Sequence, residues 1–139
     1  MSSSNFTKLQ RVQNTLARVV LRQRKYDHSP PLLYSLHWLP VKFRTTFKIA
    51  TLTHKILNSH QPAYLYDLIQ RYTPARELRS STQGRLRVNI SRTVTSSRAF
   101  RHSSVAIWND LPQDIRDQDS FCSFKRKLKT HLFCVALAT

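Results

Sequence analysis

The arginine side chains of residues 71–101 are the first candidates for chemistry in this sequence. Every basic residue in this range is an arginine, and Glu77 is its one acidic residue. A guanidinium group is a planar fork that pairs with two phosphate oxygens and stacks on bases, whereas a lysine ammonium is a point charge. The pattern therefore predicts contacts with phosphate groups. The alternative is a solvated basic loop, because residues 73–99 contain no aromatic side chain.

Acidic side chains form a second candidate group. Four of the seven acidic residues fall within ten positions, at Asp110, Asp114, Asp117 and Asp119. Such a cluster could hold divalent metal ions. These carboxylates lie on a short connector that contains proline, however, where helix capping and charge balance are the simpler interpretation. We therefore predict no carboxylate metal site.

Histidine and cysteine side chains are the remaining candidates for metal binding or nucleophilic catalysis. The tightest grouping consists of Cys122, His131 and Cys134, and its spacing matches no closed four-ligand zinc site. Two cysteines without a Cys-x-x-Cys spacing predict free thiols. The sequence thus predicts no catalytic residue, no metal site and no cofactor.

The chain is strongly basic. Its 23 lysine and arginine residues outnumber 7 acidic residues and give a net charge of +16. Residues 1–109 carry 18 basic and 3 acidic residues, whereas residues 110–139 carry 5 and 4. A charge of this size attracts polyanions, which makes nucleic acid the leading partner class. An anionic membrane surface is a rival partner for a basic amphipathic helix, although we expect no membrane partner.

Length and composition favour one helical domain. At about 100 to 200 residues per domain, a chain of 139 residues predicts a single module. Gly84 is the only glycine, which excludes glycine-rich phosphate loops and argues against a sandwich or barrel with many turns. No apolar stretch reaches the roughly 18 residues of a membrane span.

Apolar periodicity and proline positions predict the elements of the first half. Five apolar residues recur at helical spacing, at Leu9, Val12, Leu16, Val19 and Val20. They predict a basic amphipathic helix over residues 5–24 whose apolar stripe packs into the core. Prolines delimit a short helix over residues 30–39, a central buried helix over 41–57 and another helix over 62–72.

The second half is predicted to begin with an irregular segment and to end in helices. Residues 86–90 alternate between apolar and polar, which predicts a short strand if residues 93–96 pair with it and a loop otherwise. Helices are expected over residues 97–109 and from Phe121 onward. The expected fold class is mainly α, with about five helices packed as a small irregular bundle and an arginine-rich irregular segment in which one short β-hairpin is an option. The expected parts of this single module are a helical part (1–72), a basic loop or hairpin (73–96), C-terminal helices (97–133) and a tail (134–139).

Several blocks of sequence point together to one family. They are LQRVQNTLARVVL (9–21), SLHWLPVKFRTTFKIATLTHKIL (35–57), PAYLYDLI (62–69), YTPARELRSS (72–81), SRAFRHSSVAIWNDLP (97–112) and SFKRKLKTHLF (123–133). In this order they resemble the C-terminal part of reverse transcriptases from LINE-type, non-LTR retrotransposons. The resemblance covers residues 8–133. One departure is Ser96-Ser97, where a glycine is common in that family.

The resemblance implies the thumb and C-terminal extension of a multidomain RNA-directed DNA polymerase. In that family the catalytic aspartates lie in the palm, in a Tyr-x-Asp-Asp-type motif, and the endonuclease domain lies closer to the N-terminus. This sequence has no Asp-Asp pair, so no catalytic residue carries over and we expect no enzyme activity. The first residues, MSSSNFTKLQ, lack the basic-then-apolar order of a secretory signal, which predicts an intracellular location in the nucleus or cytoplasm. The resemblance alone implies the nucleus, and it makes the palm domain of the parent enzyme a candidate partner.

The expected function is non-catalytic binding of nucleic acid through its phosphates, without sequence specificity. The expected contact residues lie on the first helix and the arginine-rich segment, at Arg11, Arg18, Arg22, Arg76, Arg79, Arg85, Arg87 and Arg92. The expected ligand is an RNA/DNA hybrid or single-stranded RNA or DNA. The alternative is a structural or interaction fragment, such as a decayed transposon reading frame, that packs on missing palm and endonuclease domains.

Overall fold

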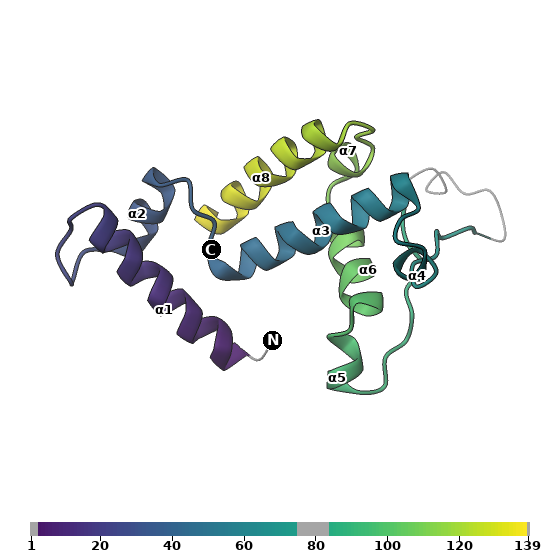
Figure 1. Ribbon diagram of the computed structural model, residues 1–139, viewed down its shortest axis with the longest axis horizontal. Helices are drawn as coiled ribbons and strands as arrows, with labels where there is room; N and C mark the ends of the chain where they lie inside the picture. The colour runs from purple at the N-terminus through teal and green to yellow at the C-terminus, as the bar shows by residue number, and fades with distance from the viewer. Residues whose placement is uncertain (1–2, 75–83, 139) are drawn as a thin grey trace. The chain divides into compact units, whose positions relative to one another are not determined.

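The computed structural model describes residues 3–74 and 84–138 (Figure 1). Helices account for most of these residues, so the mainly α fold is confirmed. The five helices of seven residues or more in the described part are α1 (Ser3–Val20), α2 (Ser29–Ser35), α3 (Val41–Ser59), α6 (Phe100–Asp110) and α8 (Phe121–Ala138). The remaining described helices are single turns, namely α4 (Ala63–Tyr66), α5 (Val94–Ser97) and α7 (Gln113–Arg116).

The chain divides into two compact units. Unit 1 comprises Met1–Phe47 and Lys129–Thr139, and unit 2 comprises Lys48–Leu128. Unit 1 contains α1, α2, the beginning of α3 and the end of α8, and α2 packs against α1 (Figure 1). None of the helices in the described residues is both long and apolar enough to cross a membrane.

Unit 2 is built around large buried side chains from α3, α6 and α8. Ile56 and Phe124 are fully buried, and Val105 is 2% exposed. The Trp108 ring stacks on Phe124 with 5.8 Å between centroids. His54, one of the histidines in the sequence, is buried in this cluster with its ring 4.1 Å from that of Phe124. These contacts give unit 2 a conventional aromatic and aliphatic core.

In unit 1, amide hydrogen bonds join α1 to the residues at and just before the start of α3. The buried Gln13 donates from Nε2 to the Leu39 carbonyl at 2.9 Å. Gln10 accepts at Oε1 from the backbone N–H of Val41, also at 2.9 Å. Ala17 is fully buried on α1. The face of α1 that packs is therefore the face that carries glutamines and alanine.

The apolar stripe of α1 does not pack into the core, and that prediction is wrong. Its exposed fractions are 43% for Leu9, 57% for Val12, 51% for Leu16, 68% for Val19 and 55% for Val20. The adjacent face packs instead, because Gln10 and Gln13 satisfy backbone groups near the start of α3 that would otherwise lose their hydrogen bonds on burial. In the described structure the stripe is therefore exposed to solvent.

One further prediction about local structure is wrong, and of the two alternatives for residues 86–90 the structure shows the loop. The helix expected over residues 62–72 ends at Tyr66, because residues 70–72 hydrogen-bond to residues 85–87 and form an isolated antiparallel bridge between Arg71 and Leu86. Residues 93–96 do not pair with residues 86–90. Thr93 caps α5 instead, with its Oγ1 accepting from the backbone N–H of Ser96 at 3.1 Å. The described residues therefore contain neither the short strand nor the β-hairpin.

Three helices are followed by a residue with left-handed backbone geometry that is not glycine. Arg22 has a φ of 51° after α1, His37 a φ of 53° after α2 and His60 a φ of 55° after α3. A residue of this conformation reverses the chain and ends a helix. The first two helices therefore end earlier than residues 24 and 39, where the sequence placed them.

Candidate nucleic-acid interface

Residues 84–87 of the arginine-rich segment are fixed against α6 in unit 2. Trp108 donates from its indole Nε1 to the Gly84 carbonyl at 3.0 Å. The Asn109 side chain binds the backbone of Leu86 twice, accepting from its N–H and donating to its carbonyl, both at 2.9 Å. Leu86 is 2% exposed and anchors the segment in the core. The backbone that carries Arg85 and Arg87 is thus held in one position.

The other edge of this short segment is held by residues that follow α4. The N–H of Tyr72 donates to the Arg85 carbonyl at 3.0 Å, and the N–H of Arg87 donates to the Gln70 carbonyl at 2.8 Å. The Arg87 guanidinium also reaches the Gln70 Oε1 at 3.4 Å. Arg85 and Arg87 flank the buried Leu86, and both side chains are exposed. Two guanidinium groups are therefore presented to solvent from a hydrogen-bonded backbone, and each can pair with two phosphate oxygens.

The other predicted contact residues of this segment, Arg76, Arg79 and Arg92, differ in whether the structure describes them. Arg92 is exposed and lies shortly before α5. Arg76 and Arg79 lie outside the described residues. The structure thus brings Arg85 and Arg87 onto one fixed element and leaves Arg92 on a neighbouring irregular stretch.

Arg116 on α7 is a basic residue of unit 2 that the sequence analysis did not select. It is 9% exposed, and its Nε and Nη1 atoms are buried without a hydrogen-bond partner. Burial lowers the pKa of Arg116 from its usual value; the positive charge of Arg85 lowers it further, while Asp117 opposes the shift. Arg85 and Arg116 are therefore close enough to repel each other. Their combined positive potential adds to the attraction that this surface exerts on an anion.

The three predicted arginines of the N-terminal region differ in their surroundings. Arg11 on α1 and Arg22 after it are exposed. Arg18 is half-buried, and its Nε donates to the Asp27 carbonyl at 3.0 Å, which ties α1 to the chain that follows it. Arg11 and Arg22 are thus available to a ligand, whereas Arg18 has a role in the fold of unit 1.

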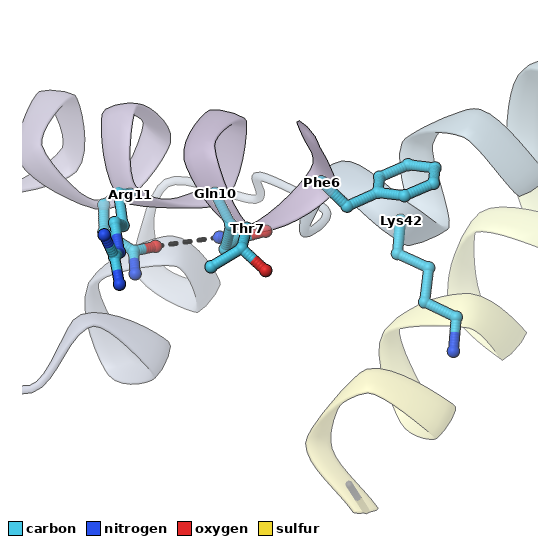
Figure 2. A pocket seen from close by; sticks show the side chains of 6 residues that line it. Phe6, Thr7, Gln10, Arg11 and Lys42 are labelled. Atoms are coloured by element: carbon cyan, nitrogen blue, oxygen red, sulfur yellow. Dashed lines mark hydrogen bonds between the residues drawn. The ribbon is translucent and has the colours of Figure 1, made fainter. Parts of the chain in front are cut away.

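Arg11 also lines a hollow between α1 and the start of α3. The hollow has a volume of about 390 Å³ and is lined by Phe6, Thr7, Gln10, Arg11, Asn14 and Lys42. Figure 2 shows Arg11 and Lys42 at opposite ends of this space, with Thr7 and Gln10 between them. We call it the cationic hollow. Lys42 is not among the contact residues predicted from the sequence, because only the fold brings the start of α3 next to α1.

A second, more apolar depression in unit 1 adjoins the cationic hollow. Its volume is about 320 Å³, and its lining includes the aromatic residues Tyr34, Trp38, Phe43 and Phe133. Tyr34 and Phe133 meet edge to face with 6.4 Å between their ring centroids. We call this depression the aromatic groove. Its residues come from α1, the region of α2, the start of α3 and the end of α8, so no local sequence pattern could have identified it.

The residues considered for metal binding or catalysis do not come together in the described part of the chain. No group of three or more histidine, cysteine, aspartate or glutamate residues there could hold a metal ion. Both cysteines, Cys122 and Cys134, are exposed free thiols. Asp114 lies in the first turn of α7, where a carboxylate interacts favourably with the helix dipole.

The surface chemistry of both units is thus cationic, with an aromatic groove added in unit 1. Unit 2 presents Arg85 and Arg87 from a fixed backbone, and unit 1 presents Arg11 and Lys42 at the cationic hollow. No protein-family model matches this chain, and no curated protein or solved structure matches it either.

Proposed function

We propose that this chain is a non-catalytic module that binds nucleic acid through its phosphates. The observation that carries the proposal is the pair Arg85 and Arg87 in unit 2, on the segment 84–87 whose backbone is fixed by hydrogen bonds. We call residues 84–87 the pinned arginine segment. Arg85 and Arg87 are exposed on a backbone that is hydrogen-bonded along both edges, so the backbone that carries the two guanidinium groups is in place before a phosphate binds. A flexible basic loop would lose more conformational entropy when it bound the same phosphates.

The charge balance of the chain supports the same function. A net charge of +16 is distributed so that the first 109 residues contain only three acidic side chains. Asp27, one of these three, already accepts a hydrogen bond from the backbone N–H of Arg24 at 2.7 Å. The exposed arginines therefore face few competing carboxylates, and a polyanion is the natural counterion.

The resemblance to LINE-type reverse transcriptases gives the proposal its biological setting. In that setting the chain corresponds to the thumb and C-terminal extension, which grip template RNA and primer DNA. The catalytic palm residues have no counterpart in this sequence, so we propose a binding role in the nucleus or cytoplasm, alone or with a palm domain. The ligand is an RNA/DNA hybrid or a single strand, bound without sequence specificity.

The salt dependence of binding tests the role of the pinned arginines. The intact chain is titrated by fluorescence anisotropy against an RNA/DNA hybrid, single-stranded RNA and duplex DNA at several salt concentrations. Each lost phosphate contact flattens the log–log salt dependence by about one unit for duplexes and somewhat less for single strands. The double variant Arg85→Ala with Arg87→Ala should therefore flatten the slope by about two units.

A matched control separates local contacts from loss of net charge. Lys48 and Lys55 are exposed on α3 in the same unit, and the double variant Lys48→Ala with Lys55→Ala removes the same charge. We expect the control to keep most of the wild-type slope. Equal slopes for the two double variants, with circular dichroism unchanged, would rule out phosphate contacts at the arginine segment.

A second candidate function is that of a structural or interaction fragment, and the exposed stripe on α1 favours it. Five aliphatic side chains, each more than 40% exposed, lie at helical spacing along one face. Such a face usually marks a contact with another protein surface. In this case the chain would bind the three nucleic acids equally weakly, and its affinity would follow its total charge alone.

A further inference from the structure

The cationic hollow and the aromatic groove of unit 1 share two lining residues. Gln10 and Asn14 belong to the walls of both spaces. The two depressions are therefore neighbours on one surface of unit 1, with the two amide side chains at their boundary. A ligand that fills both must carry negative charge at one part and a flat or apolar group at another.

The aromatic groove has the chemistry of a stacking site. Four aromatic side chains line it, and Tyr34 is 56% exposed, so one ring is open to an incoming group. Aromatic side chains that are open to solvent in a basic protein are the usual platforms for unpaired nucleobases. A volume of about 320 Å³ suits a small planar group better than a folded polypeptide surface.

The boundary between the two spaces offers one free hydrogen-bond donor. The Gln10 side chain is fully used, since Nε2 donates to Gln13 and Asn14 while Oε1 accepts from the N–H of Val41. Asn14 accepts the Gln10 hydrogen bond at 2.8 Å through Oδ1. In the described residues, the Nδ2 amide of Asn14 has no hydrogen-bond partner of its own, and it is left to donate to a ligand. Carbonyl oxygens and ring nitrogens of bases are suitable acceptors.

The cationic hollow supplies the complementary charge. Arg11 and Lys42 are both exposed, and neither depression has a carboxylate among its lining residues, all of which lie in the described part of the chain. Figure 2 shows these two cations at opposite ends of the hollow, so each would hold a different phosphate. A strand that passes along the hollow satisfies both cations, whereas a single free phosphate would satisfy one.

We propose that unit 1 binds one unpaired nucleotide of a single-stranded nucleic acid, with its base in the aromatic groove and its flanking phosphates at Arg11 and Lys42. The inference rests on the proposed nucleic-acid-binding function and adds a preference within it. Bases of a duplex are already stacked and paired, so they cannot enter the groove without being extruded. The chain therefore prefers single strands over duplexes at this site.

An oligonucleotide series with and without bases tests the stacking interaction. The intact chain is titrated with single-stranded oligothymidylate and with an abasic oligomer of the same length and charge. Stacking of one base is lost in Tyr34→Ala, which should weaken binding of the thymidylate oligomer about tenfold and leave binding of the abasic oligomer unchanged. Tyr34→Phe keeps the ring and should retain wild-type affinity.

Tyr26→Ala is the matched control for the loss of an exposed aromatic side chain. Tyr26 is 88% exposed and does not line the groove. Its replacement should leave both affinities unchanged. A Tyr34→Ala variant that binds both oligomers as wild type does, or that weakens both equally, would overturn the proposal.

The phosphate contact is tested with two lysines on the same helix. Lys42→Ala should reduce the salt dependence of single-strand binding by nearly one unit in the log–log slope, whereas Lys48→Ala should not. Both lysines are exposed on α3, but only Lys42 lines the hollow. Equal slopes for the two variants would refute the contact at Lys42.

The two proposals fail in different ways. If neither the Arg85/Arg87 double variant nor Tyr34→Ala differs from its control, both proposals fail and the chain binds nucleic acid through its total charge alone. A preserved arginine effect with no Tyr34 effect would leave the phosphate-binding function intact and remove the nucleotide site in unit 1.

Discussion

Most of the buried apolar side chains of the described residues lie in unit 2, whereas unit 1 contributes few of them and exposes the aliphatic stripe of α1. Phe124 and Ile56 in unit 2 have no exposed surface, while Leu16 and Val19 in unit 1 are 51% and 68% exposed. The stability of the chain therefore resides mainly in unit 2, because burial of apolar surface is the dominant favourable term in folding. Unit 2 fixes arginines on a rigid backbone, and unit 1 offers open surface to a ligand.

Truncation of Phe124 should have the largest effect on stability. Phe124→Ala removes a fully buried ring that contacts His54 and Trp108, and we expect a loss of about 3–5 kcal/mol in the free energy of unfolding. Urea denaturation followed by circular dichroism measures the change. A loss below about 1 kcal/mol would mean that unit 2 does not hold the main core.

Replacement of Arg116 should act in the opposite direction. Burial lowers the pKa of this side chain, so the folded state disfavours its charged form. An arginine side chain nevertheless stays charged in proteins, so the folded state carries the cost of burying that charge. Arg116→Met keeps an unbranched side chain, removes the two unsatisfied nitrogen atoms and should stabilise the chain by about 1 kcal/mol.

Thermal unfolding measures this change, with Arg92→Met as the exposed control. The control should change stability by less than about 0.5 kcal/mol. A lower melting temperature for Arg116→Met would show that the buried guanidinium stabilises unit 2 through contacts with its stem or its charge.

The stripe on α1 should contribute least to stability. The double variant Leu16→Ser with Val19→Ser replaces two exposed side chains, and each replacement should change the free energy of unfolding by less than about 0.5 kcal/mol. The same variant should bind less of a dye that reports exposed apolar surface. Destabilisation as large as that of a core variant, with unchanged dye binding, would show that the stripe is covered in solution.

Periodicity in the sequence was enough to locate the long helices but not to identify the buried face of α1. The 3.6-residue pattern predicted helices where α1, α3 and α8 occur. It also predicted a buried stripe on α1, and it failed there because Gln10 and Gln13 form hydrogen bonds to residues about thirty positions away. Such long-range partners leave no local pattern.

Only part of the candidate site could be predicted, because the rest also depends on residues that are distant in the sequence. The arginine bias selected Arg85 and Arg87, which the structure places on a fixed backbone. It did not select Arg116, which lies outside the arginine-rich range of residues 71–101. Lys42 and Tyr34 acquire a site only when α1, α2 and α3 come together.

The residues with left-handed backbone geometry that follow α1, α2 and α3 connect two features of the sequence, its scarcity of glycine and its positive charge. Helices often end in glycine, because a side chain raises the energy of this conformation. Here Arg22, His37 and His60 occupy such positions, and Gly84 is the only glycine in the sequence. A cation at the carboxyl end of a helix interacts favourably with the helix dipole. The substitution Arg22→Gly would lower the energy of the left-handed backbone conformation. It would also remove a positive charge and weaken the attraction for a polyanion, so backbone conformation and charge favour different residues at this position.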